Sequence, residues 1–352
     1  MESSTSVQQL FFRHVKEGLP SHLSLVDEIA DLLNISTDSA YRRIRGEKAI
    51  SFDEIRTLCA HFRISLDQLF QLESNNIIFW GRFINDTDFV FDNYLGDILK
   101  QVIYFNSFTE KELMIMSKDV PIFHHFNFPA LAAFKCFFWM KTVLQYPGLS
   151  KQRFTADDLQ DPRIQTCSRI IEEYNKIPSL EIWNVETIHA TIRQVEYYRD
   201  TKIFASDKDV AVVYDCLHRT VDHIEAQAEL GTKFLPGASP GAKGVAPGER
   251  GWPPDAKGGT PGAKGAPLKF YVNEFILGDN TYLACLDDKK LIFINHSVLN
   301  TIRTKDTYFT ESMHEHFRNI IRKSTQISGV GEKERSRFFN TIRDKIEVSR
   351  SS

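Results

Sequence analysis

The chain has 352 residues, 42% of them hydrophobic and 25% charged, and its 43 basic and 46 acidic residues give a net charge of −3. This length predicts more than one domain, and the composition excludes a wholly disordered chain. The balanced charge indicates no polyanionic partner for the protein as a whole, so any such partner must be bound by a local patch.

Neither a membrane segment nor a secretory signal is expected. The longest apolar stretch, residues 131–146, is interrupted by Lys135 and Lys141 and is shorter than the ~20 residues of a membrane helix. The opening MESSTSVQQL lacks the basic and apolar regions of a signal peptide. Five single cysteines without a CxxC pair fit a reducing compartment. We therefore expect a cytoplasmic protein without a membrane partner.

Residues 1–73 carry a string of short amphipathic helical patterns. A first helix is expected around residues 7–15. In the second, apolar residues recur at i, i+3, i+4 and i+7 from Val26 to Leu33. Asn34 suits the left-handed conformation that ends a helix, and Ser36 is a natural N-cap for the next one.

The third helix, predicted over residues 37–45, carries the side chains of chemical interest. At ~100° per residue, four residues share the face expected to pack: Thr37, Ala40, Tyr41 and Ile44. The opposite face holds short polar groups and guanidinium groups: Asp38, Ser39, Arg42 and Arg45, with Arg43 on its flank.

Two more helices complete the N-terminal pattern. Ser51 and Glu54 have the spacing of a capping box for a fourth helix. Its apolar residues fall between positions 55 and 62, and residues 66–70 suit a short fifth helix. The N-terminal region is therefore predicted to be an all-α five-helix domain.

This helix string resembles the Cro/phage-repressor (XRE-type) helix-turn-helix family of bacterial transcriptional regulators. The resemblance covers roughly residues 6–72 and rests on four features: Ala30, the turn Asn34-Ile35-Ser36, the pattern ending Ile44-Arg45-Gly46, and the trailing IxxLCxxFxISLDQLF. Asn34 stands where the family commonly has glycine. The hydrophobic anchor is Ile44, one place later than is common, with Tyr41 beside it.

The resemblance implies a homodimer that binds double-stranded DNA, in the nucleoid, with the third helix in the major groove. It places Thr37, Asp38 and Ser39 at base edges, and Arg42 at a guanine or a phosphate. Three further residues are assigned to phosphates: Arg43, Arg45 and Lys48. Residues 1–73 nevertheless hold eight basic and eleven acidic residues, so phosphate neutralisation must come from a focused patch.

Residues 76–352 are predicted to form a larger mixed α/β domain. Helical patterns cover residues 91–105, 185–200, 209–230, 310–324 and 332–346. Two further helices are expected to begin at Pro129 and at Pro162. Strand patterns cover residues 113–116, 122–126 and 179–184, then KFYVNEF, TYLACL and LIFIN, the last two joined as a hairpin.

Residues 236–267 differ from everything around them, with nine of the 18 glycines and seven of the 13 prolines. The glycines are not spaced every third residue, so a collagen triple helix is excluded. The segment is predicted to be a disordered, low-complexity loop inserted within the second domain.

The second domain is too large to serve only for dimerisation, and we expect it to sense an unknown small-molecule or protein effector as well.

No nucleotide-binding or protease motif is present, so no catalytic, metal or cofactor site is assigned and the chain is not expected to be an enzyme. Asp215, His218 and Asp222 share a helical face, but they are more simply explained as ordinary polar residues at the protein surface than as metal ligands. The basic segment 332–346 is a candidate dimer contact. Two alternatives stay open: a DNA-tethered enzyme or degenerate enzyme, and a protein-interaction module that binds no DNA.

Overall fold

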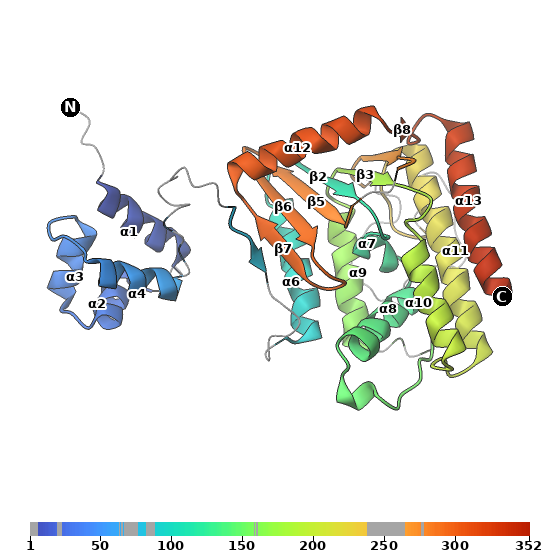
Figure 1. Ribbon diagram of the computed structural model, residues 1–352, viewed down its shortest axis with the longest axis horizontal. Coiled ribbons are helices and arrows are strands. Elements are labelled where there is room, and N and C mark those ends of the chain that lie inside the picture. The colour runs from blue at the N-terminus through green and yellow to red at the C-terminus, as the bar shows by residue number, and fades with distance from the viewer. Residues whose placement is uncertain are drawn as a thin grey trace. The chain divides into compact units, whose positions relative to one another are not determined.

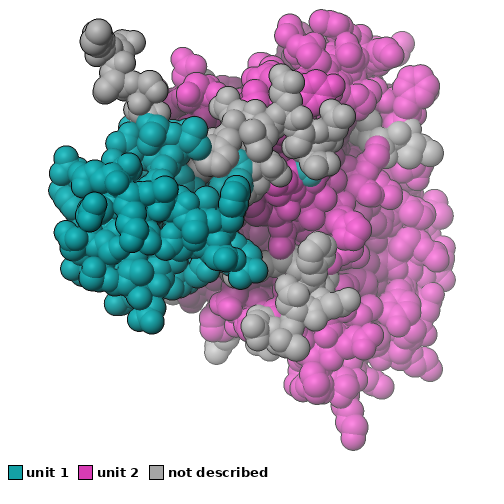
Figure 2. Space-filling view, turned by 60° about the vertical axis from the view of Figure 1, so that its left-hand side comes forward, with its two compact units in different colours: residues 1–77 teal, residues 78–352 magenta. Residues whose placement is uncertain are grey.

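The structure is a computed structural model that describes residues 6–19, 23–62, 64, 66, 77–81, 89–157, 159, 161–237, 265–275 and 278–352 (Figure 1). The chain divides into two compact units, residues 1–77 and 78–352, coloured separately in Figure 2. Within the described residues, no helix is both long enough and apolar enough to cross a bilayer.

Unit 1 is helical. Its elements are α1 (Val7–Gly18), α2 (Leu25–Leu33), α3 (Thr37–Ile44) and α4 (Phe52–Phe62). The local signals act as predicted: Asn34 ends α2 in the left-handed conformation, at φ 52° and ψ 52°, and Ser36 accepts a hydrogen bond from the Ser39 backbone. The fifth helix expected over residues 66–70 lies, apart from Leu66, outside the described residues.

The four helices of unit 1 share one small apolar core. Its fully buried members come from all four: Phe11, Phe12, Val15, Ile29, Ala30, Ala40 and Leu58. Ala30 on α2 and Ala40 on α3 are both small and buried, and this lets the two helices approach closely. The core therefore fixes which side of α3 faces inward.

Unit 2 is built on a mixed sheet of eight strands in the order β1-β7-β6-β5-β2-β3-β4-β8. The strands are β1 (Trp80–Gly81), β2 (Lys111–Met116), β3 (Ser179–Trp183), β4 (Leu268–Val272), β5 (Thr281–Leu286), β6 (Lys289–Asn295), β7 (Thr301–Thr304) and β8 (Thr325–Gln326). Neighbours β2, β3 and β4 are parallel, and the other pairs are antiparallel. The predicted hairpin is β5–β6.

Helices cover both faces of this sheet (Figure 1). They are α6 (Phe91–Asn106), α7 (Ile122–His125), α8 (Pro129–Phe138), α9 (Pro162–Tyr174), α10 (His189–Asp200), α11 (Asp207–Leu230), α12 (Thr307–Arg322) and α13 (Glu332–Ser351). A π-helical turn, η1 (Trp139–Val143), and a 3-10 turn, η2 (Pro147–Leu149), follow α8.

The alternation of side chains along β3 shows how the two faces differ. Leu180 and Ile182 belong to a smaller apolar cluster, in which they pack with Phe317 of α12. Glu181 and Trp183 point the other way, toward the main core under α6 to α11 and α13, where Trp183 packs. A polar side chain that points into the main core is shielded from water, so it needs hydrogen-bond partners from the protein itself.

One expectation for unit 2 is wrong. Residues 122–126, predicted as a strand, form the short helix α7, because the chain turns after Pro121 and His124 and Phe126 donate backbone hydrogen bonds three residues back. The candidate dimer face of segment 332–346 is already covered within the chain: Phe338, Ile342 and Ile346 are buried in the main core.

The ends of the Gly/Pro-rich segment are held together. Thr232 pairs with Pro267, and the Lys233 amide donates to the Ala266 carbonyl at 2.9 Å. The strand that follows, β4, lies between β3 and β8, so the chain before and after the segment belongs to one sheet. Most of the predicted loop of residues 236–267, namely residues 238–264, lies outside the described residues.

Candidate nucleic-acid interface

The candidate interface is α3 with the loop that follows it. Ser36 caps the start of the helix. Gly46 follows its end with φ 79°, a backbone conformation that residues other than glycine rarely adopt. The Glu47 and Lys48 amides donate to the Arg42 carbonyl at 2.8 and 3.2 Å. The loop therefore folds back onto the last turn of the helix.

The inward side of α3 differs from the predicted one. Ala40 is fully buried and Ile44 half-buried, as expected, but the third inward residue is Arg43 at 6% exposure. Thr37 is exposed, and Tyr41 is 49% exposed. The helix is thus rotated from the predicted orientation, because Arg43 finds polar partners inside and takes the place expected for Tyr41.

Those partners neutralise Arg43. Its guanidinium donates to both carboxylate oxygens of Glu54, at 2.7 and 3.2 Å, and to the Ser39 hydroxyl at 2.6 Å. Glu54 also accepts from the Ser51 amide at 2.8 Å, which completes the predicted capping box. Partial burial acts to raise the pKa of Glu54, but the bonds from Arg43 and Ser51 outweigh it and the pKa lies below its ordinary value.

The sequence assigned Arg43 to a phosphate and Ser39 to a base, and their contacts point to a different role. Both side chains are engaged within unit 1, and together with Glu54 they join α3 to α4. We therefore leave Arg43 and Ser39 out of the candidate contact surface.

The remaining predicted residues do share an exposed surface. We define the outer face of α3 as six exposed residues: Thr37, Asp38, Tyr41, Arg42, Arg45 and Lys48. The Arg45 guanidinium lies over the Tyr41 ring, 5.6 Å from its centre, and pairs with Glu47 at 3.3 Å. Among the residues that the structure describes, Arg42 has no ion-pair partner. Sequence reasoning missed Tyr41, because an aromatic residue at helical spacing is more often part of a core.

Two glutamines of α1 hold this region in place, and nothing in the sequence pattern marked them. The Gln8 amide donates to the carbonyls of Arg43 and Lys48, at 2.7 and 2.8 Å, and accepts from the Ile50 amide at 3.1 Å. Gln9 donates to the Arg45 carbonyl at 2.8 Å. The end of a helix leaves carbonyl groups without partners, and α1 supplies these partners for α3.

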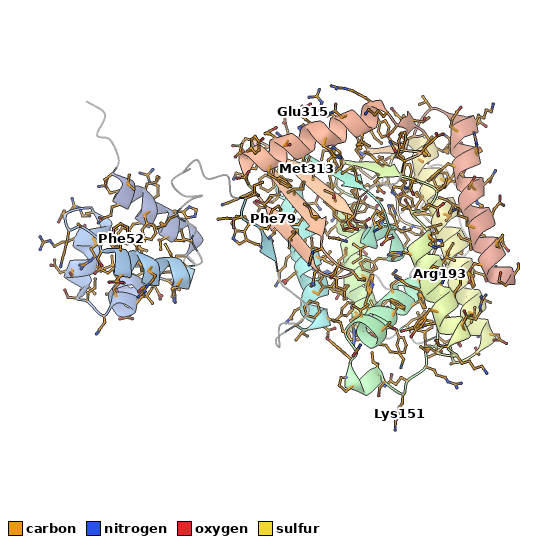
Figure 3. The ribbon with its side chains drawn as sticks, in the orientation of Figure 1. Phe52, Phe79, Lys151, Arg193, Met313 and Glu315 are labelled. Carbon is orange, nitrogen blue, oxygen red and sulfur yellow. The ribbon has the colours of Figure 1, made fainter. Side chains whose placement is uncertain are left out.

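One large apolar side chain of unit 1 is almost completely exposed. Phe52, labelled in Figure 3, is the first residue of α4 and is 90% exposed. Isolated exposed apolar residues are common on protein surfaces. Phe52 is therefore not assigned a role in the candidate interface.

The buried charges of unit 2 form a different kind of centre. Glu181, fully buried on β3, accepts from Tyr174 at 2.5 Å, from Trp183 at 2.8 Å and from His124 at 2.9 Å. Lys233, also fully buried, donates to the carbonyls of Tyr174 and Ile177. Burial acts to raise the pKa of Glu181, but the interactions with His124, Tyr174 and Lys233 outweigh it and lower the pKa to about 2.

The three polar residues predicted to share one face of α11 contact α13. Asp215 pairs with Arg350 at 2.8 Å, Asp222 with Arg343 at 2.8 Å, and His218 contacts Glu347 at 2.7 Å. Across the described residues, no group of three or more His, Cys, Asp or Glu is arranged to hold a metal ion. The shared face of α11 is therefore explained by packing between two helices.

Comparison with known proteins adds no relative to this description. No protein-family model, no curated protein and no solved structure matches the chain.

Proposed function

We propose that this chain is a sequence-specific DNA-binding transcriptional regulator, in which α3 enters the major groove and unit 2 serves effector sensing, dimerisation or both. The observation that carries the proposal is the outer face of α3, where Arg42 and Arg45 are exposed on a helix whose other side is fixed by Ala40 and Arg43. A major groove accommodates one α-helix, and guanidinium groups bind guanine edges and phosphates.

Each residue of the outer face has a role in this proposal. Thr37 and Asp38, in the first turn, contact base edges, and Arg42 contacts a guanine or a phosphate. Arg45 and Lys48 contact phosphates, which fix position without reading sequence. The ring of Tyr41 supports the Arg45 guanidinium from one side and limits its orientations.

Residues 1–73 carry more acidic than basic residues, which would weaken binding to phosphates, but the outer face of α3 has its own local charge. Arg43 is paired within the fold by Glu54, so that acidic residue does not reduce the exposed charge. Of the six residues of the outer face, Arg42, Arg45 and Lys48 are basic and only Asp38 is acidic, while Glu47 beside this face pairs with Arg45. A homodimer would double this patch and would read two half-sites about 34 Å apart.

The test is selection of bound duplexes from a random library with the full chain, followed by binding measurements on the enriched sequence. Arg42→Ala should weaken binding about fivefold or more, since a bidentate arginine–base contact is worth about 1–3 kcal/mol. Arg56→Ala is the matched control, because Arg56 is exposed on α4 beside Asp53 and lies outside the candidate interface. Binding to the enriched site should also weaken steeply with salt.

Two results would contradict the proposal. One is a selection that enriches no sequence with the wild-type chain. The other is equal binding by Arg42→Ala and Arg56→Ala. Association that does not depend on salt would instead favour a protein-interaction module, to which the exposed Phe52 would be suited.

A further inference from the structure

The segment that follows β2 concentrates buried polar atoms without partners. Between Ser117 and Asn127 there are five, of the ten found in the described part of the chain: the Ser117 hydroxyl, Nδ1 of His124 and of His125, and both amide atoms of Asn127. These residues are 0–4% exposed. A buried polar atom without a partner costs about 1–3 kcal/mol, so native proteins rarely leave several together.

A buried lysine belongs to the same region. Lys135 of α8 is 3% exposed, and its ammonium donates to the Gln194 side chain at 2.6 Å and lies 5.2 Å from the centre of the Trp139 ring. No carboxylate of the described residues forms an ion pair with it. An ammonium has three donors, so Lys135 has hydrogen-bonding capacity beyond Gln194. Burial lowers the pKa of Lys135 to about 7, and the Asp119 carboxylate opposes that shift only in part.

Contacts to one helix, α10, link two of these groups, His125 and Lys135, beyond the carboxyl ends of the central strands β2 and β3. Nε2 of His125 lies 3.0 Å from the Thr191 hydroxyl, and Thr191 and Gln194 lie on successive positions of one face of α10. The ammonium of Lys135 acts electrostatically on His125. Ser117 follows the carboxyl end of β2, and α10 follows that of the parallel strand β3. Open α/β sheets bind ligands at the carboxyl ends of parallel strands.

We propose that Lys135, together with the polar groups of residues 117–127, binds a small organic monocarboxylate. A carboxylate supplies the anion that Lys135 lacks and offers further acceptors to buried donors. Asp119, exposed beside this region and acting on Lys135, repels a dianion such as phosphate more strongly than a monocarboxylate. The binding itself is independent of any role in DNA recognition. Only its use as an effector rests on the proposed function.

The test measures the melting temperature of the full chain at pH 7 with acetate or pyruvate in the millimolar range. The melting temperatures of the wild-type chain and of Lys151→Met should both rise by about 3 °C at a ligand concentration about ten times the Kd. Lys151, labelled in Figure 3, is an exposed lysine outside the cluster and is the matched control. Lys135→Met should fold and lose the gain, because a buried lysine replaced by an apolar residue of similar length leaves no charge to satisfy. Inorganic phosphate should give a smaller gain.

Several outcomes would overturn the proposal. These are no gain with either carboxylate in the wild-type chain, an equal gain in Lys135→Met, or a gain from phosphate as large as from acetate. Should Lys135→Met not fold, a high-resolution crystal structure of the wild-type chain grown in acetate decides the matter. Planar density bonded to the Lys135 ammonium supports the proposal, and ordered water alone at these atoms overturns it.

A second measurement separates this site from the proposed function. Binding of the selected duplex is titrated with and without pyruvate, in the wild-type chain and in Lys135→Met. A change in DNA affinity that only the wild-type chain shows supports the effector role. A melting shift without any DNA binding leaves the carboxylate site standing and contradicts the DNA-binding proposal alone.

Discussion

Each unit of the molecule contains a buried basic side chain, Arg43 in unit 1 and Lys135 in unit 2, and the two differ in what surrounds them. Arg43 in unit 1 donates to both oxygens of Glu54 and to Ser39. Lys135 in unit 2 has one amide oxygen and the face of an indole ring. A buried charge with a complete set of partners holds helices together, whereas one without a counter-charge leaves room for a partner from outside the chain. Partnership, and not burial alone, therefore distinguishes a structural charge from a candidate ligand site.

The largest expected effect comes from breaking the best-satisfied centre of unit 2. Glu181→Leu removes the carboxylate that accepts from His124, Tyr174 and Trp183, and leaves all three donors buried. Loss of one partner in such a network destabilises a protein by about 3–5 kcal/mol. Urea unfolding followed by tryptophan fluorescence would measure the loss. A decrease below about 1 kcal/mol would show that the donors find other partners.

The same carboxylate makes the stability depend on pH, with a defined sign. Its pKa is about 2 in the folded chain against an ordinary value of 4.5. Folding therefore stabilises the ionised form of Glu181. This contribution to the free energy of unfolding is present above pH 4.5 and is lost as the pH falls toward 2. The difference in unfolding free energy between the wild-type chain and Glu181→Gln should narrow over that window. A constant difference would contradict the assignment.

In unit 1, two adjacent arginines provide a matched pair. Arg43→Ala should destabilise unit 1 by about 1–3 kcal/mol, because Glu54 and Ser39 lose a charged partner. Arg42→Ala should change stability by less than about 0.5 kcal/mol, because Arg42 is exposed. Thermal unfolding followed by circular dichroism would compare them. Equal stabilities would mean that the Arg43–Glu54 pair contributes nothing to the fold.

The sequence predicted local structure in unit 1 well where a single residue decides the outcome. Asn34, Ser36 and the Ser51–Glu54 box act through their own backbone and near neighbours, so their spacing is sufficient. The rotation of α3 was mispredicted because it depends on a contact eleven residues away, between Arg43 and Glu54. Hydrophobicity alone ranks Tyr41 above Arg43 for the core, and a buried ion pair reverses that order.

In unit 2 the sequence identified most helices and strands but not their order or the polar centre. The parallel alignment of β2, β3 and β4 joins residues 113, 179 and 268, and no local pattern encodes that pairing. Residues 122–126, an aromatic-rich segment predicted as a short strand, form α7 because the chain turns after Pro121. The cluster around Lys135 could not be predicted, because its members come from α7, α8 and α10 and meet only through the fold.

The smallest effect, and the one that best sharpens the comparison, concerns the contact between α1 and α3. Gln8→Ala removes three hydrogen bonds to the end of α3 and the loop after it, so unit 1 should lose about 1 kcal/mol. Exposed carbonyls can turn to water once Gln8 is gone, which keeps this loss below that of Arg43→Ala. Amide hydrogen exchange over residues 43–50 should quicken in Gln8→Ala and stay unchanged in Lys16→Ala, an exposed position on the same helix. Unchanged exchange in both variants would mean that the loop keeps its conformation through the Arg42 carbonyl alone, and that α1 does not position the outer face of α3.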